Sequence, residues 1–330
     1  MDYSDLIRNL LIGNTRAAAR LISIVENSID AAEEIINSIY EHTGNAYIIG
    51  ITGAPGTGKS SFISTLTTIF IKEGKKIGII CVDPTSPLTG GALLGDRIRM
   101  KQHFSLDNVF IRSMANRGQL GGLARATEDT IKILDAYGCD IIIVETVGVG
   151  QSEVDIFKSA HTVVVLLVPG MGDEIQAIKA GIMEIVDIFV VNKMDLQGAD
   201  KKVADIMQML ELRKGYKYKS TKKKIFEKID LWMPEITKVN SRTGENFNYL
   251  FELINKHKDF IENSGVISNY MNNRIKNETI EILKYKLTRK VEEILNSDSK
   301  IESLIEKVKE KSLDPYSMAN LIIKMLGLEE

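Results

Sequence analysis

The stretch that decides the fold is Gly53-Ala54-Pro55-Gly56-Thr57-Gly58-Lys59-Ser60, which matches the phosphate-binding pattern G-x-x-x-x-G-K-[ST]. An apolar run at 47–52 precedes it and a helical pattern at 61–73 follows it, so the motif has the strand–loop–helix context that it requires. In such a loop, backbone N–H groups surround the β-phosphate and the helix dipole adds attraction. We expect Lys59 to bridge the β- and γ-phosphates, Ser60 to bind Mg²⁺, and Ser61 to extend the nucleotide contacts into the helix.

A second motif, Asn192-Lys193-Met194-Asp195, follows an apolar run at 188–191 and matches the N-K-x-D pattern that reads guanine. The Asp195 carboxylate can accept the N1 and N2 protons of guanine, and adenine offers no such pair of donors. We expect Asn192 to support the loop and the Lys193 stem to cover the ring face. The later run Asn240-Ser241-Arg242 sits where a backbone N–H could meet guanine O6, although an ordinary turn explains these residues nearly as well.

A third element, Glu145-Thr146-Val147-Gly148, ends the apolar run 141–144 and resembles a D-x-x-G motif with glutamate in place of aspartate. We expect Glu145 to act on Mg²⁺ directly or through water, and Gly148 to offer its N–H to the γ-phosphate. The predicted catalytic set is therefore Lys59, Glu145 and Gly148. Val149 stands where Ras-type enzymes place a water-orienting glutamine, so we expect slow intrinsic hydrolysis that a partner completes.

Around these motifs the sequence predicts an α/β fold of the P-loop NTPase type, with a mostly parallel sheet flanked by helices. Expected strands lie at 47–52, 76–82, 109–112, 141–145, 163–168, 188–192 and 238–240. The predicted domains are a helical N-terminal appendage at 1–45, a GTPase domain at 46–265 and a helical C-terminal arm at 266–330.

The C-terminal arm carries an apolar stripe with helical spacing. Its residues are Ile280, Leu283, Leu287, Val291 and Ile294. From this pattern alone, the stripe could pack on the protein's own core or form a dimer. Asp314 followed by Pro315 predicts the start of a last helix.

Two long loops begin where predicted strands end, at the edge where open α/β sheets bind ligands. One covers 82–100. The other contains the candidate switch residues Pro169, Gly170, Gly172, Asp173, Glu174, Gln176 and Lys179. Both are candidates for loops ordered by nucleotide, and ordinary surface loops are the alternative.

Composition excludes several classes of protein. The net charge of −2 over 330 residues provides no global basic field for nucleic acid or anionic lipid. The apolar runs are too short for a membrane span, and the acidic N-terminus does not resemble a signal peptide. Cys81 and Cys139 form no CxxC motif, which indicates a reducing compartment and no structural zinc. We therefore expect a cytoplasmic protein.

A lysine-rich segment at 211–230 is either a basic docking patch or, more simply, a solvated face.

These motifs together resemble the MeaB/MMAA/ArgK group of P-loop GTPases. The matching segments are Val82-Asp83-Pro84-Thr85-Ser86-Pro87, 90–100, Arg117-Gly118 to Gly121-Gly122, 144–153 and 169–179. The resemblance implies a GTP-hydrolysing chaperone that gates adenosylcobalamin loading and protection of an acyl-CoA mutase, typically methylmalonyl-CoA mutase. It also implies GTP/GDP and Mg²⁺ as ligands, with Asp83, Asp96 and Glu145 joining Ser60 around the metal. The resemblance further implies a homodimer formed through the C-terminal helices, and a switch at 169–179 that senses the nucleotide.

Two other readings share the P-loop. A metal-inserting GTPase of the hydrogenase, urease or CobW type carries cysteine or histidine delivery motifs, which Cys81 and Cys139 do not supply. A transport-system kinase uses a P-loop to phosphorylate an acceptor, but ordinary ATP-dependent kinases do not need the guanine-reading motif at 192–195. Both readings remain alternatives to the mutase chaperone.

Overall fold

A computed structural model of the chain describes residues 2–83, 106, 108–115, 122–146, 160–170, 185–220, 232–264, 266–297 and 299–325. It separates into two compact units, Met1–Arg274 and Ile275–Glu330. The first unit contains the sheet and both nucleotide motifs. The second unit is helical and is described by itself below.

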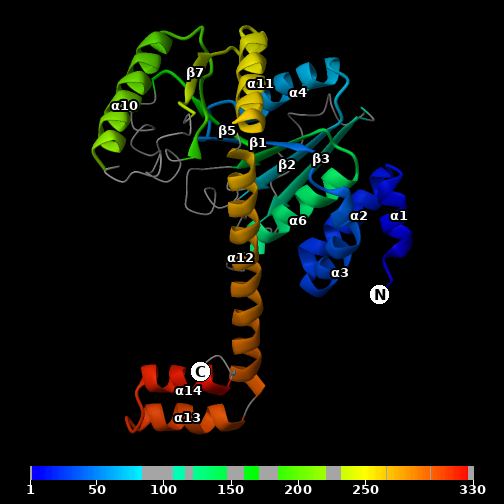
Figure 1. The fold of residues 1–330 in the computed structure, drawn as a ribbon, viewed down its shortest axis with the longest axis vertical. Coiled ribbons are helices and arrows are strands. Elements are labelled where there is room, and N and C mark those ends of the chain that lie inside the picture. The colour runs from blue at the N-terminus through cyan, green and yellow to red at the C-terminus, as the bar shows by residue number, and fades with distance from the viewer. Residues whose placement is uncertain are drawn as a thin grey trace. The chain divides into compact units, whose positions relative to one another are not determined.

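The centre of the first unit is a seven-stranded sheet in the order β3-β2-β4-β1-β5-β6-β7 (Figure 1). Its strands are β1 (Tyr47–Gly53), β2 (Ile77–Asp83), β3 (Val109–Ala115), β4 (Ile141–Thr146), β5 (Thr162–Leu167), β6 (Ile188–Val191) and β7 (Glu235–Lys238). Every neighbouring pair is parallel, which confirms the predicted fold class. All strands therefore end at the same edge of the sheet, and β1 delivers the phosphate-binding loop to the middle of that edge.

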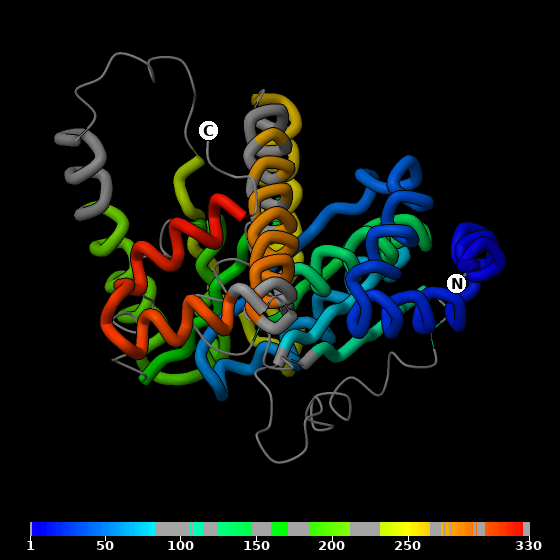
Figure 2. The backbone as a smooth tube through the Cα atoms, turned by 90° about the horizontal axis from the view of Figure 1, so that it is seen from below, coloured from blue at the N-terminus to red at the C-terminus, as the bar shows by residue number. Residues whose placement is uncertain are grey.

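Alternate residues of each strand face opposite helical layers. In β4, Ile141 and Ile143 pack with α4 (Lys59–Lys72) and α11 (Phe247–Asn263), whereas Ile142 and Val144 face the other layer. On that side α6 (Gly122–Ala136) packs against β2, β3 and β4. Helices α2 (Thr15–Asn27) and α3 (Ile29–Ile39) pack against α6, and α1 (Ser4–Leu11) packs against α2 and α3. Helix α10 (Ala199–Ser220) packs against β6 and β7 at the opposite end (Figure 2).

The N-terminal helices form part of the core of the first unit. Leu21, Ile22 and Val25 on α2 are fully buried in the same apolar cluster as the strand residues Ile142 and Val144. The predicted helical character of residues 1–45 is confirmed by α1, α2, α3 and the short 3₁₀ helix Tyr40–His42. These helices are positioned by long-range apolar contacts, which helical periodicity alone does not specify.

The predicted last strand at 238–240 is wrong in its position. Strand β7 ends at Lys238, and Asn240 forms an isolated antiparallel bridge with Glu245. The Asn240 side-chain oxygen accepts the N–H groups of Arg242 and Thr243 at 3.0 and 3.4 Å. An asparagine that binds the backbone ahead of it favours a turn over an extended strand, so the chain bends where the strand was expected.

The second unit contains the C-terminal part of α12 (Val266–Ser297) with α13 (Ser299–Lys309) and α14 (Pro315–Met325). Asp314 caps α14 as predicted, because its carboxylate accepts the N–H groups of Tyr316 and Ser317 at 2.9 and 3.1 Å. The stripe residues Leu283 and Leu287 of α12 are 52% and 43% exposed. Among the described helices, none is both long and apolar enough to cross a membrane.

Candidate guanine-nucleotide site

The loop after β1 has the backbone conformation that its glycines predict. Gly56 and Gly58 have φ values of 85° and 90°, which other residues adopt only with strain. A Cβ atom at Gly53 would lie 2.5 Å from the Leu166 carbonyl oxygen of the neighbouring strand β5. The loop therefore needs glycine for its turns and for the close approach between β1 and β5.

Lys59 and Ser60 open helix α4 directly after the loop, and they are only 7% and 6% exposed. The Lys59 ammonium donates to the carbonyl oxygens of Gly53 and Ala54 at 2.8 and 3.3 Å, which holds its charge at the loop. The residue before the helix is Gly58, which has no side chain to accept the first helical N–H groups. These donors and the lysine together make an anion-binding site of the kind predicted for a phosphate.

Glu145 lies in β4. Its register partners are Cys81 in β2 on one side and Ile51 in β1 on the other. Its side chain is 2% exposed, and the Cys81 thiol donates to Oε2 across 3.7 Å. A buried carboxylate at the same sheet edge as the Ser60 hydroxyl offers the hard oxygen donors that Mg²⁺ prefers, so these residues fit the metal. Asp83 is the last residue of the adjacent strand β2, and the structure describes its backbone but not its side chain. Asp96 and Gly148 lie outside the described residues.

Asn192 connects the two motifs. Its side-chain amide donates to the Thr57 carbonyl oxygen at 2.8 Å, and its Oδ1 accepts the N–H and the hydroxyl of Ser241 at 3.1 and 2.8 Å. The side chain is 1% exposed, so these bonds are made in a dry environment where losing one is costly. Asn192 therefore ties the phosphate loop, the end of β6 and the 240–242 loop into one site.

The other members of the guanine motif are also brought to this place. Lys193, which has a left-handed φ of 57°, reaches back so that its ammonium donates to the Gly56 carbonyl oxygen at 2.9 Å. Asp195 is exposed, and its Oδ1 accepts from the side-chain amide of Asn240 at 2.9 Å. This leaves the Asp195 carboxylate fixed in direction and accessible to a base.

The backbone N–H groups that were predicted to meet guanine O6 already have hydrogen-bond acceptors in the structure. The N–H of Ser241 donates to Asn192 and that of Arg242 to Asn240. A guanine oxygen at this loop would have to share one of these N–H groups or displace its present acceptor. The contact itself stays a prediction.

The candidate switch begins inside the described residues and continues outside them. Pro169 and Gly170 follow β5, and Gly170 turns the chain with a φ of 86°. They leave the same sheet edge as the phosphate loop, as predicted. Gly172, Asp173, Glu174, Gln176 and Lys179 lie outside the described residues.

Two positioning contacts were not predicted. The Asn240 amide orients Asp195, and the Thr65 hydroxyl of α4 donates to the Ser241 carbonyl oxygen at 2.8 Å. Asn240 was expected only to lie in the base-contacting loop, and no spacing rule relates Thr65 to Ser241. Both contacts depend on how α4 and the 240–242 loop approach each other in space.

A pair of buried groups with shifted pKa values lies away from this site, near the amino ends of the strands. Burial raises the pKa of Asp187 to about 7 and lowers that of His257 to about 4. Asp187 Oδ1 lies 3.4 Å from His257 Nε2, and Thr162 contacts Nδ1 of the same ring at 2.8 Å. This buried cluster joins β5, β6 and α11, and we assign it a structural role, because it stands before the strands while the nucleotide motifs follow them.

Replacing Gly58 by alanine should damage the site beyond the strain of the backbone. The new Cβ would lie 2.7 Å from Asn192 Nδ2, so the Asn192 amide has to move and its bond to the Thr57 carbonyl oxygen is weakened. Gly74 is a matched control, because its φ of 72° is equally left-handed and nothing lies within 4 Å of a Cβ there. We expect Gly74→Ala to cost about 1 kcal/mol of stability with nucleotide affinity intact, and Gly58→Ala to weaken GTP binding at least about tenfold. Nucleotide affinity is measured by fluorescent-nucleotide titration. Equal affinities in the two variants would contradict a role of the Asn192–loop hydrogen bond in GTP binding.

Comparison with known proteins agrees with the geometry. The family model described as methylmalonyl Co-A mutase-associated GTPase MeaB matches residues 18–296. A Pyrococcus horikoshii protein that carries the name of a GTPase is 50% identical over 98% of both chains. The GTPase ArgK of Escherichia coli is 32% identical over 79% of this chain and 78% of its own length. A crystal structure of a LAO/AO transport system kinase has the same fold, with a TM-score of 0.64, 21% identity and coverage of 98% of this chain and 97% of that chain.

Proposed function

This chain belongs to the MeaB family of P-loop GTPases, and from that premise we propose that it uses GTP to control an adenosylcobalamin-dependent acyl-CoA mutase. The observation that carries the proposal is the family match across residues 18–296, which includes both nucleotide motifs. The controlled steps would be loading of the cobalamin cofactor and protection of the loaded mutase. Methylmalonyl-CoA mutase is the client that we propose first.

Within this proposal, each described site residue has a role in binding or hydrolysis. Asp195 selects guanine, with Asn192 and Lys193 supporting the base and the loop. Lys59 and the loop N–H groups hold the β- and γ-phosphates. Ser60 and Glu145 would hold Mg²⁺, together with Asp83 and with Asp96 from outside the described residues. The ion would supply positive charge against the charge that develops on the phosphates.

Slow hydrolysis in the absence of the client follows from the sequence around Gly148, where valine replaces the water-orienting glutamine. We propose that the mutase completes the site through the 169–179 switch. Pro169 and Gly170 support this coupling, because they leave the nucleotide edge of the sheet. The switch would therefore report the nucleotide state to the client.

The test is to measure GTP hydrolysis by the purified chain with and without an adenosylcobalamin-dependent methylmalonyl-CoA mutase. We expect a low basal rate that rises at least about tenfold as mutase is added, because a partner-completed site gains orienting groups. Co-purification in the presence of a non-hydrolysable GTP analogue reports binding separately from rate. A fast rate without mutase, or an unchanged rate at every mutase concentration, would contradict the proposal.

We further propose a homodimer formed through the C-terminal helices. Exposed leucines on α12, including Leu283 and Leu287, support this because a continuous apolar stripe is stabilised when a partner covers it. Sedimentation velocity should show that Leu287→Glu shifts the chain from dimer toward monomer, while Thr288→Glu at an adjacent exposed position leaves it dimeric. A wild-type chain that sediments as a monomer would overturn this assignment.

The buried free thiols of Cys81 and Cys139 support a reducing location, for which we propose the cytoplasm.

A further inference from the structure

Helix α2 presents a polar and basic face on the side opposite to its buried residues. The buried residues are Ala17, Ala18, Leu21, Ile22 and Val25. The opposite face is formed by Arg16, Ala19, Arg20, Ser23 and Ile24, whose spacing of three and four places them along one side of the helix. Arg16 and Arg20 are exposed, and neither has an ion-pair partner within the part of the chain that the structure describes.

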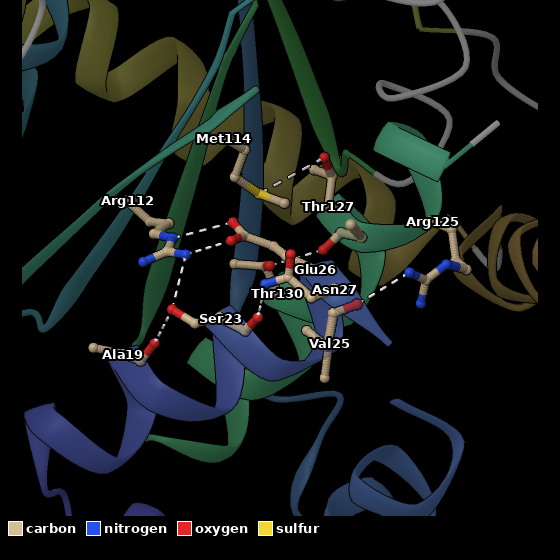
Figure 3. Close-up of polar contacts among 11 residues, drawn as sticks. Ala19, Ser23, Val25, Glu26, Asn27, Arg112, Met114, Arg125, Thr127 and Thr130 are labelled. Atoms are coloured by element: carbon tan, nitrogen blue, oxygen red, sulfur yellow. Dashed lines mark hydrogen bonds and ion pairs between the residues drawn. The ribbon is translucent and has the colours of Figure 1, made fainter. Parts of the chain in front are cut away.

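A third arginine approaches this face from the edge strand β3. Figure 3 shows the Arg112 guanidinium turned toward α2, where its Nε and Nη2 both donate to the Glu26 carboxylate. Nη2 also donates to the Ser23 hydroxyl at 3.1 Å. The Arg112 and Glu26 side chains are 19% and 12% exposed, so this two-pronged pair is largely shielded from water. Arg112 is therefore held rigidly, and Ser23 connects it to the exposed face of α2.

Between the helix and the strand lies a hollow of about 610 Å³, lined by Arg16, Ala19, Arg20, Ser23, Ile24 and Arg112. We call this hollow the α2–β3 groove. A second hollow of about 470 Å³ shares Arg20, Ser23 and Ile24 with it and is also lined by Asp2, Tyr3 and Leu6 of the N-terminal segment. The two hollows are neighbours, because three residues line both of them.

The charge of the groove differs from that of the chain. Three guanidinium groups line it and Glu26 engages one of them, whereas the whole chain has a net charge of −2. The positive surplus therefore belongs to the α2–β3 groove, because the lining of the adjoining hollow includes the acidic residue Asp2 as well as Arg20. Ala19 and Ile24 provide the apolar part of the lining of the groove.

We propose that the α2–β3 groove binds an acidic segment of a partner protein, in which carboxylates alternate with apolar side chains. The forked guanidinium groups of Arg16 and Arg20 match carboxylates, because each can form two parallel N–H···O bonds. An apolar side chain between the acids would lie over Ala19 and Ile24. A membrane surface fits less well, because anionic lipid is usually attracted by clusters of four to eight basic residues, and this site has three.

This inference is independent of the proposed function. The groove lies on α2 and β3, and it shares no residue with the nucleotide site. Loss of peptide binding and loss of GTP turnover can therefore be measured separately in the same variants.

The test uses the full chain and a fluorescein-labelled hexapeptide of alternating glutamate and leucine, followed by fluorescence anisotropy. The groove variant is Arg16→Glu/Arg20→Glu. Its control, Arg8→Glu/Lys72→Glu, changes the net charge equally at two exposed residues that do not line the groove. Unchanged fluorescent-GTP affinity confirms that both variants are folded.

We expect saturable binding to the wild-type chain that weakens with added salt, at least about tenfold weaker binding by the groove variant, and less than about a twofold change in the control. The corresponding glutamine–leucine peptide should bind at least about tenfold more weakly than the acidic one. Equal losses in the two variants, equal binding of the two peptides, or no saturable binding would overturn the proposal. So would binding to phosphatidylserine vesicles without binding to the peptide.

Discussion

Replacing Asp195 by asparagine is expected to change the base preference from guanine to xanthine nucleotides. The carboxylate accepts two guanine protons, and the replacement amide would face the guanine amino group with its own donor. Loss of the charge-assisted bond from the amino group, together with the two donors that then face each other, corresponds to about 3 kcal/mol, or roughly 100-fold weaker GTP binding. Xanthine carries an oxygen at the position of that amino group, so the amide can donate to it and accept from N1.

The structure makes this substitution a clean test. Asn240 donates to Asp195 Oδ1 at 2.9 Å, and an amide oxygen can accept the same bond, so the side chain should keep its direction. Competition of GTP, XTP and ATP for a fluorescent nucleotide measures the preference. Asp200→Asn is the control, because that carboxylate is 89% exposed on α10 and pairs with Lys238. Unaltered selectivity in Asp195→Asn would refute the guanine assignment.

Lys59→Ala should reduce single-turnover GTP hydrolysis at least about 100-fold. Its ammonium is expected to stabilise charge that develops between the β- and γ-phosphates, and loss of one such group commonly costs two to three orders of magnitude. The bonds from Nζ to Gly53 and Ala54 are lost as well, so the loop should also bind nucleotide more weakly. Measuring turnover at saturating GTP separates these two effects.

Two further variants sharpen the lysine test. Lys59→Arg keeps the charge but must fit a wider planar group where only 7% of the residue is exposed, so it should rescue little activity. Lys72→Ala removes an exposed lysine from the other end of α4 and should leave turnover unchanged. Substantial turnover by Lys59→Ala would show that the phosphates bind elsewhere.

Much of the fold was predictable because its signals are local. The apolar runs predicted the strands of a parallel sheet, and the motif at 53–60 predicted the phosphate loop in which the structure places left-handed turns at Gly56 and Gly58. The last strand was misplaced because Asn240 looked like a continuation of the run from Lys238, whereas its side chain binds the backbone of the next turn. Strand ends are decided by such side-chain bonds as much as by apolar pattern.

The sequence by itself determined that this protein has a phosphate loop and a guanine-reading motif, because each is a short segment whose chemistry depends on neighbouring residues. Only the tertiary structure decided that Asn192 binds the Thr57 carbonyl, that Asn240 orients Asp195, and that Arg112 meets Glu26 of α2. These contacts join residues 135, 45 and 86 positions apart. The order of the strands and the packing of the helices bring them together, and neither is encoded in any single stretch of the chain.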